Sequence, residues 1–390
     1  MSSFLAAASG TVGTDDVRHV GTDDVRQAAS NNLSCKSTWA RLNNRVRARR
    51  PTKYASSTLL GKETLFSIPK PEELQHELLD LQKPFELSNE DIVEFRKRRY
   101  IRLKAVLPPG LLRSAKKRVV AMGTKATGGR DVSLPQGFVK ESDGSQSDND
   151  RYWREISEPN TRSWNIQMMW AVDPVVRALV LSPRVGDIVC KLLDCANVRL
   201  YHDNFLSRAP GSKRTLWHCD DGPNGYMALA GRQVVTVWFP LHHCTPENGS
   251  LIFPRMDAKG GVIEPKSCLT SWDVAKLDGC PLEEQSDEYD AFCAASLEQS
   301  GAFPEEATYE IGDISIHATD CYHSAGPNLT GRVRNIIAAT YFADTTAMRT
   351  DKDFTTMTKG QRNDWQKFAP GVLPGEQVAT RFNPLVPHCQ

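Results

Sequence analysis

The 390-residue sequence has no apolar run near the roughly 18 residues that a membrane-spanning helix requires. It also lacks an excess of either charge, because 48 Lys and Arg oppose 47 Asp and Glu for a net charge of +1. Its ten cysteines include no CxxC pair, which excludes the usual zinc-finger spacings. Their scatter indicates reduced thiols rather than a disulfide framework. We therefore expect a globular protein of the cytoplasm, with no membrane or nucleic-acid partner.

Residues 1–70 differ from the remainder of the chain. The hexapeptide GTDDVR occurs at 13–18 and again at 21–26, and an Arg-rich stretch follows without an apolar face. Arginine and serine are typical of an organelle transit peptide, but the aspartates of the repeat argue against one. We predict a disordered leader over 1–70, with organelle targeting as the alternative.

Residues 71–390 are predicted to form a single domain with a helical N-terminal part at 71–197. Ser88, followed by Asp91, is typical of a helix N-cap. Helical periodicity predicts further helix over 164–195, broken at Ser182-Pro183 because proline resists continuation. Residues 123–150, rich in Gly, Ser and Asp, predict a loop.

From residue 198 the apolar pattern changes to a period of two. Short β-branched or aromatic runs are bounded by Gly, Pro and Asn, which predicts strands. These runs lie at 198–205, 234–240, 251–253, 314–316 and 336–341. They predict an α+β fold with a mainly β core at 198–344, an antiparallel barrel or sandwich with helices packed outside. An insertion at 255–310 is expected to form its own helices, and 345–390 form a C-terminal segment.

The stretch WHCD at 217–220 holds the strongest chemical signal. In an extended strand alternate side chains share a face, so His218 and Asp220 point the same way while Cys219 points away. A second histidine from a later strand would complete a 2-His-1-carboxylate triad, which suits non-haem Fe(II) oxygen chemistry.

Three segments carry a resemblance to a known family: VRLYHDNFLSRAPGSKRTLWHCD, VVTVWFPLHHCTPENGSLIF and GDISIHATDCYHSAGPNLTGRVRNIIAATYFAD. Together they resemble the phytanoyl-CoA dioxygenase family of Fe(II)/2-oxoglutarate oxygenases, from about residue 88 to residue 387. The resemblance implies a double-stranded β-helix (jelly roll, a cupin-like barrel). It also implies His218, Asp220 and His323 as catalytic metal ligands. Arg334, eleven residues past His323, matches the arginine that pairs with the far carboxylate of 2-oxoglutarate.

Further residues are candidates for binding the cosubstrate. Thr236 and Trp238 alternate with valines, so they are expected to face the inside of the barrel, although Trp238 also suits the core. The family often has a serine two residues past the distal histidine, where this chain has Ala325, and the adjacent Ser324 is the candidate here. The family also often has lysine where this chain has Arg208.

Two assignments have rivals. His317 competes with His323 for the distal metal position, and we favour His323 because HSAGPN begins there. Arg332 competes with Arg334 because the two would share a face of an extended strand. Three other histidines, His202, His242 and His243, are interpreted as structural or as lining the site.

The resemblance implies a dioxygenase that hydroxylates a small or medium-sized organic molecule and releases succinate and CO2. Fe(II) is the expected cofactor, 2-oxoglutarate the cosubstrate and O2 the oxidant. A carboxylate at position 220 leaves no ligand position for chloride, so hydroxylation is favoured over halogenation. Two alternatives are a non-catalytic protein that binds metal or 2-oxoglutarate, and a cupin-like metal isomerase or hydrolase that needs no cosubstrate. The sequence does not assign an oligomeric state.

Overall fold

A computed structural model describes residues 71–126, 163–221, 227–231, 233–255, 287–299, 302–350 and 359–389. The predicted leader, most of the predicted loop at 123–150 and residues 256–286 of the insertion lie outside the described residues. All described residues belong to one compact unit, residues 53–390. None of the described helices is both long and apolar enough to cross a membrane.

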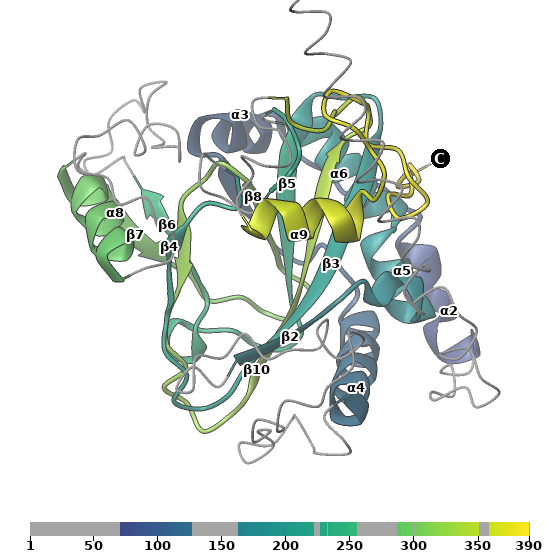
Figure 1. The fold of residues 1–390 in the computed structure, drawn as a ribbon. Coiled ribbons are helices and arrows are strands. Elements are labelled where there is room, and N and C mark those ends of the chain that lie inside the picture. Colours follow the sequence, from purple (N-terminus) through teal and green to yellow (C-terminus); the bar gives the residue numbers. More distant parts are fainter. Residues whose placement is uncertain are drawn as a thin grey trace, which may run out of the picture. The chain divides into compact units, whose positions relative to one another are not determined.

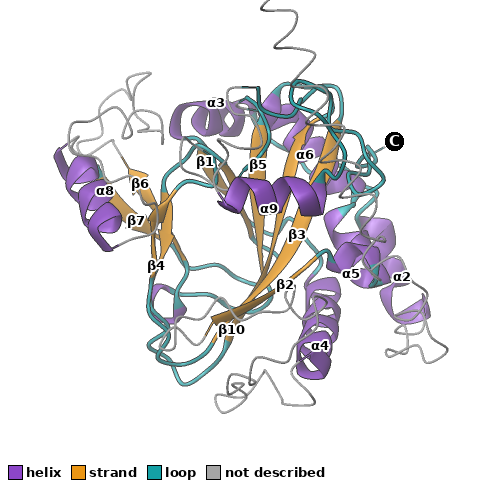
Figure 2. Cartoon of the chain, viewed as in Figure 1, coloured by secondary structure: helices purple, strands orange, loops and turns teal. Residues whose placement is uncertain are grey.

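The described strands form two antiparallel sheets that face each other (Figures 1 and 2). The large sheet has the order β1-β8-β5-β10-β3-β2 and the small sheet the order β4-β9-β6-β7. The large sheet comprises β1 (Tyr100–Leu103), β2 (Ser163–Gln167), β3 (Val198–Arg208), β5 (Val234–Pro240), β8 (Ile314–Ala318) and β10 (Arg334–Ala343). The small sheet comprises β4 (Thr215–His218), β6 (Leu251–Arg255), β7 (Phe303–Glu306) and β9 (His323–Ala325). The mainly β core is thus confirmed, although the sheets do not close into a barrel.

Helices cover the outer face of the large sheet, and this packing makes the main hydrophobic core. Alternate residues of β5, Val235, Val237 and Phe239, point into that core. These helices are α2 (Pro71–Asp80), α3 (Asn89–Arg98), α4 (Pro109–Ala126), α5 (Pro174–Val180) and α6 (Pro183–Leu193). The short 3₁₀ helices are η3 (Met169–Ala171) and η4 (Pro246–Asn248). The predicted external helices are confirmed.

Local sequence signals explain several helix ends. The Ser88 hydroxyl accepts from the Asp91 N–H while the Asp91 carboxylate accepts from the Ser88 N–H, a capping box that confirms the predicted start of α3. The break at Ser182 is also confirmed, because Ser182 caps α6 and Pro183 occupies its first turn. The helix predicted from residue 164 is wrong at its start, because Ser163–Gln167 forms β2 and pairs with β3. Pairing with an existing strand overrides local helical periodicity there.

A second cluster of apolar side chains fills the space between the sheets, with members from β5, β6, β9 and β10. Trp238 and Ile336 belong to it, so the other alternate face of the large sheet points inward. Two further helices flank the sheets, α8 (Asp287–Gln299) beside the small sheet and α9 (Lys359–Phe368), which crosses in front of β3 in Figure 1. The helix α8 lies in the insertion, as expected.

Candidate metal centre and anion site

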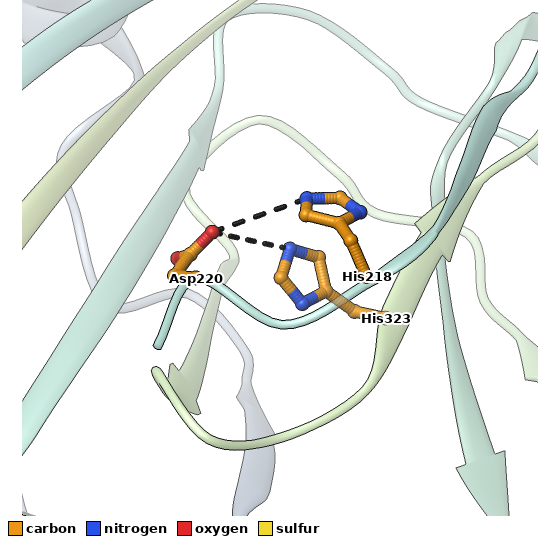
Figure 3. Close-up of side chains that lie close together, drawn as sticks. All are labelled: His218, Asp220 and His323. Carbon is orange, nitrogen blue, oxygen red and sulfur yellow. Dashed lines mark ion pairs between the residues drawn. The ribbon is translucent and has the colours of Figure 1, made fainter. Parts of the chain in front are cut away.

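His218, Asp220 and His323 lie together where the small sheet meets the loop after β4 (Figure 3). His218 ends β4 and His323 begins β9, and the two are cross-strand partners. Each Nε2 lies 3.9 Å from Oδ1 of Asp220. One ligand atom from each residue falls within 4.8 Å of the others. The structure therefore brings together the three residues that the sequence singled out.

Backbone carbonyls orient both imidazoles. The Nδ1 of His218 lies 2.8 Å from the Leu216 carbonyl, and the Nδ1 of His323 lies 3.1 Å from the Cys321 carbonyl. Because a carbonyl only accepts, each Nδ1 carries the proton and each Nε2 keeps its lone pair toward the cluster. Burial lowers the pKa of both histidines, which keeps them neutral.

Asp220 stays ionised although it is buried. Burial raises the pKa of its carboxyl, but nearby His317, His323 and His218 outweigh that effect and lower the pKa overall. Its Oδ2 accepts a hydrogen bond of 2.9 Å from the Thr236 hydroxyl and lies 3.7 Å from Nε2 of His317. Two neutral imidazole nitrogens and one carboxylate oxygen are a donor set that suits Fe(II), so these residues fit the ion that the sequence implies.

The loops next to the metal cluster are tied to each other and to two arginines. The N–H of Asp221 donates to the Thr319 carbonyl at 2.8 Å. The Asp221 carboxylate pairs with buried Arg349 at 2.8 Å. Asp320 accepts from Nε and Nη2 of Arg99, at the end of α3. These contacts fix the segments on both sides of the metal cluster.

The helix α8 packs behind β4 and β9, the strands that carry His218 and His323. Trp217 and Tyr322, which point away from the cluster, share an apolar cluster with its Cys293 and Leu297. Asp290 of α8 accepts the Trp217 N–H at 2.6 Å. The insertion thus contributes a support for β4 and β9.

Arg334 and Arg208 are direct cross-strand partners on the inner face of β10 and β3. Arg334 is 3% exposed and its Nε has no hydrogen-bond partner among the described residues. Burial lowers the pKa of Arg334 to about 10 and that of Arg208 to about 9, where the neighbouring charge of Arg334 adds to burial. Both guanidinium groups still carry a charge at neutral pH. Arg334 is buried and Arg208 is half-buried, with Nη1 of Arg208 donating to the Lys213 and Gly326 carbonyls at 3.2 Å. Neither has a carboxylate hydrogen-bonded to it in the described part of the chain, so the two cations form a candidate anion site.

The other predicted site residues divide into two groups. Thr236 and Trp238 face inward as expected, and the Trp238 ring lies 6.0 Å from the Arg334 guanidinium carbon. Ser324 lies on the opposite face of β9 from His323, where its hydroxyl donates to the Thr215 carbonyl at 2.6 Å. The structure therefore does not bring Ser324 into the site.

The structure also distinguishes the residues that competed for the same predicted roles. Arg332 is exposed, whereas Arg334 is buried in the site. His317 stands beside Asp220 with both ring nitrogens lacking hydrogen-bond partners among the described residues. His242 accepts the Asn335 N–H at 3.0 Å, and His243 is exposed next to Glu310. The sequence matched Arg208 to a lysine that the family often has, but only strand register places it opposite Arg334.

Comparison with known proteins decides the family. The sequence profile of the phytanoyl-CoA dioxygenase (PhyH) family matches residues 95–336. This chain belongs to the phytanoyl-CoA dioxygenase family. The resemblance carried by the motifs is confirmed, and the chain is an enzyme of the Fe(II)/2-oxoglutarate-dependent class. No curated protein sequence matched it significantly.

Two similar crystal structures support the jelly-roll fold. One is the non-haem α-ketoglutarate-dependent carbocyclase SnoK from nogalamycin biosynthesis, at 18% identity and a TM-score of 0.50, covering 78% of this chain and 99% of SnoK. The other is the epimerase SnoN from the same biosynthesis, at 17% identity and a TM-score of 0.51, covering 76% of this chain and 97% of SnoN. Identities this low show a shared fold only. The predicted double-stranded β-helix is confirmed.

Proposed function

We propose that this phytanoyl-CoA dioxygenase family member is an Fe(II)- and 2-oxoglutarate-dependent dioxygenase that hydroxylates a small or medium-sized organic molecule and releases succinate and CO2. One observation carries the proposal. A cluster of two neutral imidazoles and one carboxylate shares the space between the sheets with two guanidinium groups, buried Arg334 and half-buried Arg208, neither of which is hydrogen-bonded to a described carboxylate.

His218, Asp220 and His323 would hold the iron. Bound Fe(II) would supply oxygen activation coupled to the decarboxylation of 2-oxoglutarate. The residues contribute orientation and charge, because the two Nε2 lone pairs and the Asp220 carboxylate are fixed before any ion binds. Since position 220 is a carboxylate and not Gly or Ala, chloride has no position to occupy, and this favours hydroxylation over halogenation.

Arg334 would bind the far carboxylate of 2-oxoglutarate, with Arg208 as a second cation. A guanidinium presents two parallel N–H groups to a carboxylate and stays charged when buried. The dianion would also offset the repulsion between the two arginines, which lie opposite each other on adjacent strands. This supports an acidic cosubstrate over a cosubstrate-free isomerase or hydrolase, for which the facing arginine pair would have no ligand.

Anaerobic titration of the apo protein with Fe(II) and 2-oxoglutarate tests the proposal. We expect the weak visible charge-transfer band of the iron chelate, and we expect Arg334→Met to remove it at concentrations that saturate the wild type. Arg332→Met, at the exposed neighbouring arginine, should leave the band unchanged. Iron binding without the band would exclude the cosubstrate.

Admission of O2 then separates the remaining alternatives. A dioxygenase consumes 2-oxoglutarate and forms succinate, whereas a non-catalytic binding protein does neither. Because SnoK and SnoN are by name a carbocyclase and an epimerase, oxygen from ¹⁸O2 must be found in the organic product for hydroxylation to stand. Turnover without O2 would refute the dioxygenase.

A further inference from the structure

His202 is a buried imidazole on β3 that lies outside the metal cluster. It is 5% exposed, and neither ring nitrogen has a hydrogen-bond partner among the described residues. The backbone of Asp203 lies close enough to act on the ring electrostatically but without hydrogen-bond geometry. A buried polar atom without a partner is costly, by about 1–3 kcal/mol, so two on one side chain require an explanation.

His202 shares the inner face of β3 with Asn204 and Arg208, and a β-bulge lies directly beside it. The register between β10 and β3 pairs Thr340 with His202 and Tyr341 with Leu200, which leaves Tyr201 without an opposite residue. Tyr201 and His202 therefore point to the same side, and both contact Phe368 of α9. Bulges are frequent beside active sites because they redirect side chains in this way.

His202 belongs to a polar row that runs to the metal cluster. His317, Thr236, Thr340 and His202 occupy one register level on β8, β5, β10 and β3. The Thr340 and Thr236 hydroxyl oxygens are 3.1 Å apart, and Thr236 donates to Asp220. Two residues along β3, Asn204 also has a buried Oδ1 with no partner in the described part of the chain. This edge of the site thus offers several unused hydrogen-bonding atoms.

His202 is kept neutral by its burial, although charged groups lie near it. Burial lowers the pKa of His202 to about 4, although the charge of Asp220 opposes the shift. Burial also raises the pKa of Asp364 to about 8, against the hydrogen bond of 2.8 Å from the Tyr201 hydroxyl. The ammonium of Lys367 donates to Gln167 at 2.9 Å. A neutral imidazole offers one donor and one acceptor, which suits hydroxyl and amide groups better than ions.

We propose that His202, on the inner face of β3 and backed by Phe368, is a substrate-binding residue, and that the substrate carries neutral hydroxyl or amide groups which bind its imidazole. The inference rests on the proposed function, since it names the substrate class of the same site. It places the substrate between the metal cluster and α9. Its chemical reason is that the two unused ring nitrogens gain partners only when such a ligand binds.

Small probes that share one ring test the chemical class. They are cyclohexanemethanol and cyclohexanecarboxamide, against cyclohexanecarboxylate and cyclohexylmethylammonium. The full-length protein is loaded anaerobically with Mn(II) and 2-oxoglutarate, and paramagnetic relaxation of the probe protons reports binding near the metal. We expect the alcohol and the amide to bind more tightly than both ions.

Three variants test the residue. His202→Phe keeps the ring that stacks on Phe368 but removes both nitrogens, and we expect neutral probes to bind about threefold to tenfold more weakly, as for one lost hydrogen bond. His202→Gln retains a neutral donor and acceptor and should recover most of the binding. The control His243→Phe alters an exposed histidine and should bind as the wild type does.

Stability provides a second readout. Because His202→Phe removes two unpartnered buried atoms, it should raise the thermal midpoint of the apo protein, by roughly 2 °C or more. A lowered midpoint would mean that His202 is a structural residue and would overturn the inference.

Three results of the binding experiments would contradict the inference, and a control separates them from failure of the proposed function. If an ionic probe binds as tightly as the neutral ones, if His202→Phe binds them as the wild type does, or if no neutral probe is relaxed up to its solubility, the inference is wrong. Relaxation of the 2-oxoglutarate protons serves as the internal control. Its absence means that the proposed function has failed, whereas its presence without probe relaxation means that only this inference has failed.

Discussion

Replacing Thr236 with valine removes a hydroxyl while nearly keeping the shape of the side chain. That hydroxyl donates to Oδ2 of Asp220 at 2.9 Å, and Thr236 is 6% exposed, so water cannot easily replace it. A hydrogen bond to an ionised partner is worth about 1.5–3 kcal/mol. Since about 1.4 kcal/mol is a tenfold change in affinity, we expect Thr236→Val to weaken metal binding about 10- to 100-fold.

Titration of the apo protein with Mn(II), followed by electron paramagnetic resonance of the free ion, measures that affinity. Thr340→Val is the matched control. Its hydroxyl lies 3.1 Å from that of Thr236 and only reaches Asp220 through it, so the control should lose about threefold or less. If Thr236→Val binds Mn(II) as tightly as the wild type, Thr236 does not orient the metal-binding carboxylate. Equal losses in both variants would mean that general packing, and not this hydrogen bond, is responsible.

Three other perturbations address the anion site, a buried acid and the helical layer. Arg334→Met should weaken 2-oxoglutarate binding by about 30-fold or more, as expected when one partner of a buried charge pair is lost. Arg332→Met, at an exposed arginine, should not weaken it. Calorimetry measures both affinities, and equal effects would mean that the wrong arginine has been assigned. Asp364 has a folded-state pKa raised from its usual value of 3.8 to about 8, so wild-type stability should fall as pH rises between these values. The upper limit of this slope is about 1.4 kcal/mol per pH unit, and urea titrations at several pH values should show it reduced in Asp364→Asn. Asp173 both caps α5 and pairs with buried Arg118 at 2.9 Å. Asp173→Ala should therefore destabilise the fold by about 3–5 kcal/mol, and Asp173→Asn, which keeps the cap, by less. Equal losses of stability in urea would exclude a contribution from the cap.

The sequence predicted the strands in which apolar and polar residues alternate over enough positions to show a period of two. The run predicted at 234–240 matches β5 (Val234–Pro240), and the runs near 198 and 336 fall inside β3 and β10. The strands β4 and β9 have only four and three residues, too few for a period to show. The strand β2 was predicted as helix because its pairing with β3 is a tertiary effect.

In the candidate site too, features set by local sequence could be predicted and features set by strand pairing could not. The cluster of His218, Asp220 and His323 could be predicted because His218 and Asp220 are two apart in an extended segment, and the motif around His323 resembles a known family. The pairing of Arg208 with Arg334 depends on strand register between distant segments, which composition does not specify. The placing of both Tyr201 and His202 against Phe368 depends in addition on a bulge, which turns Tyr201 to the face of His202 and breaks the alternation on which the prediction relied.

The candidate functional groups come from both sheets, so a ligand that contacts groups of both would link the sheets. His218 and His323 belong to the small sheet, whereas Thr236, Arg334 and His202 belong to the large one. Among the described contacts, the Thr236 hydroxyl on Asp220 and the Asp221 N–H on the Thr319 carbonyl join the segments that carry the metal residues to the large sheet or its connections. A ligand that met both the metal residues and Arg334 would add a further link. Binding of metal and 2-oxoglutarate together should therefore stabilise the fold more than the sum of their separate effects, because the first ligand fixes the sheet separation that the second requires.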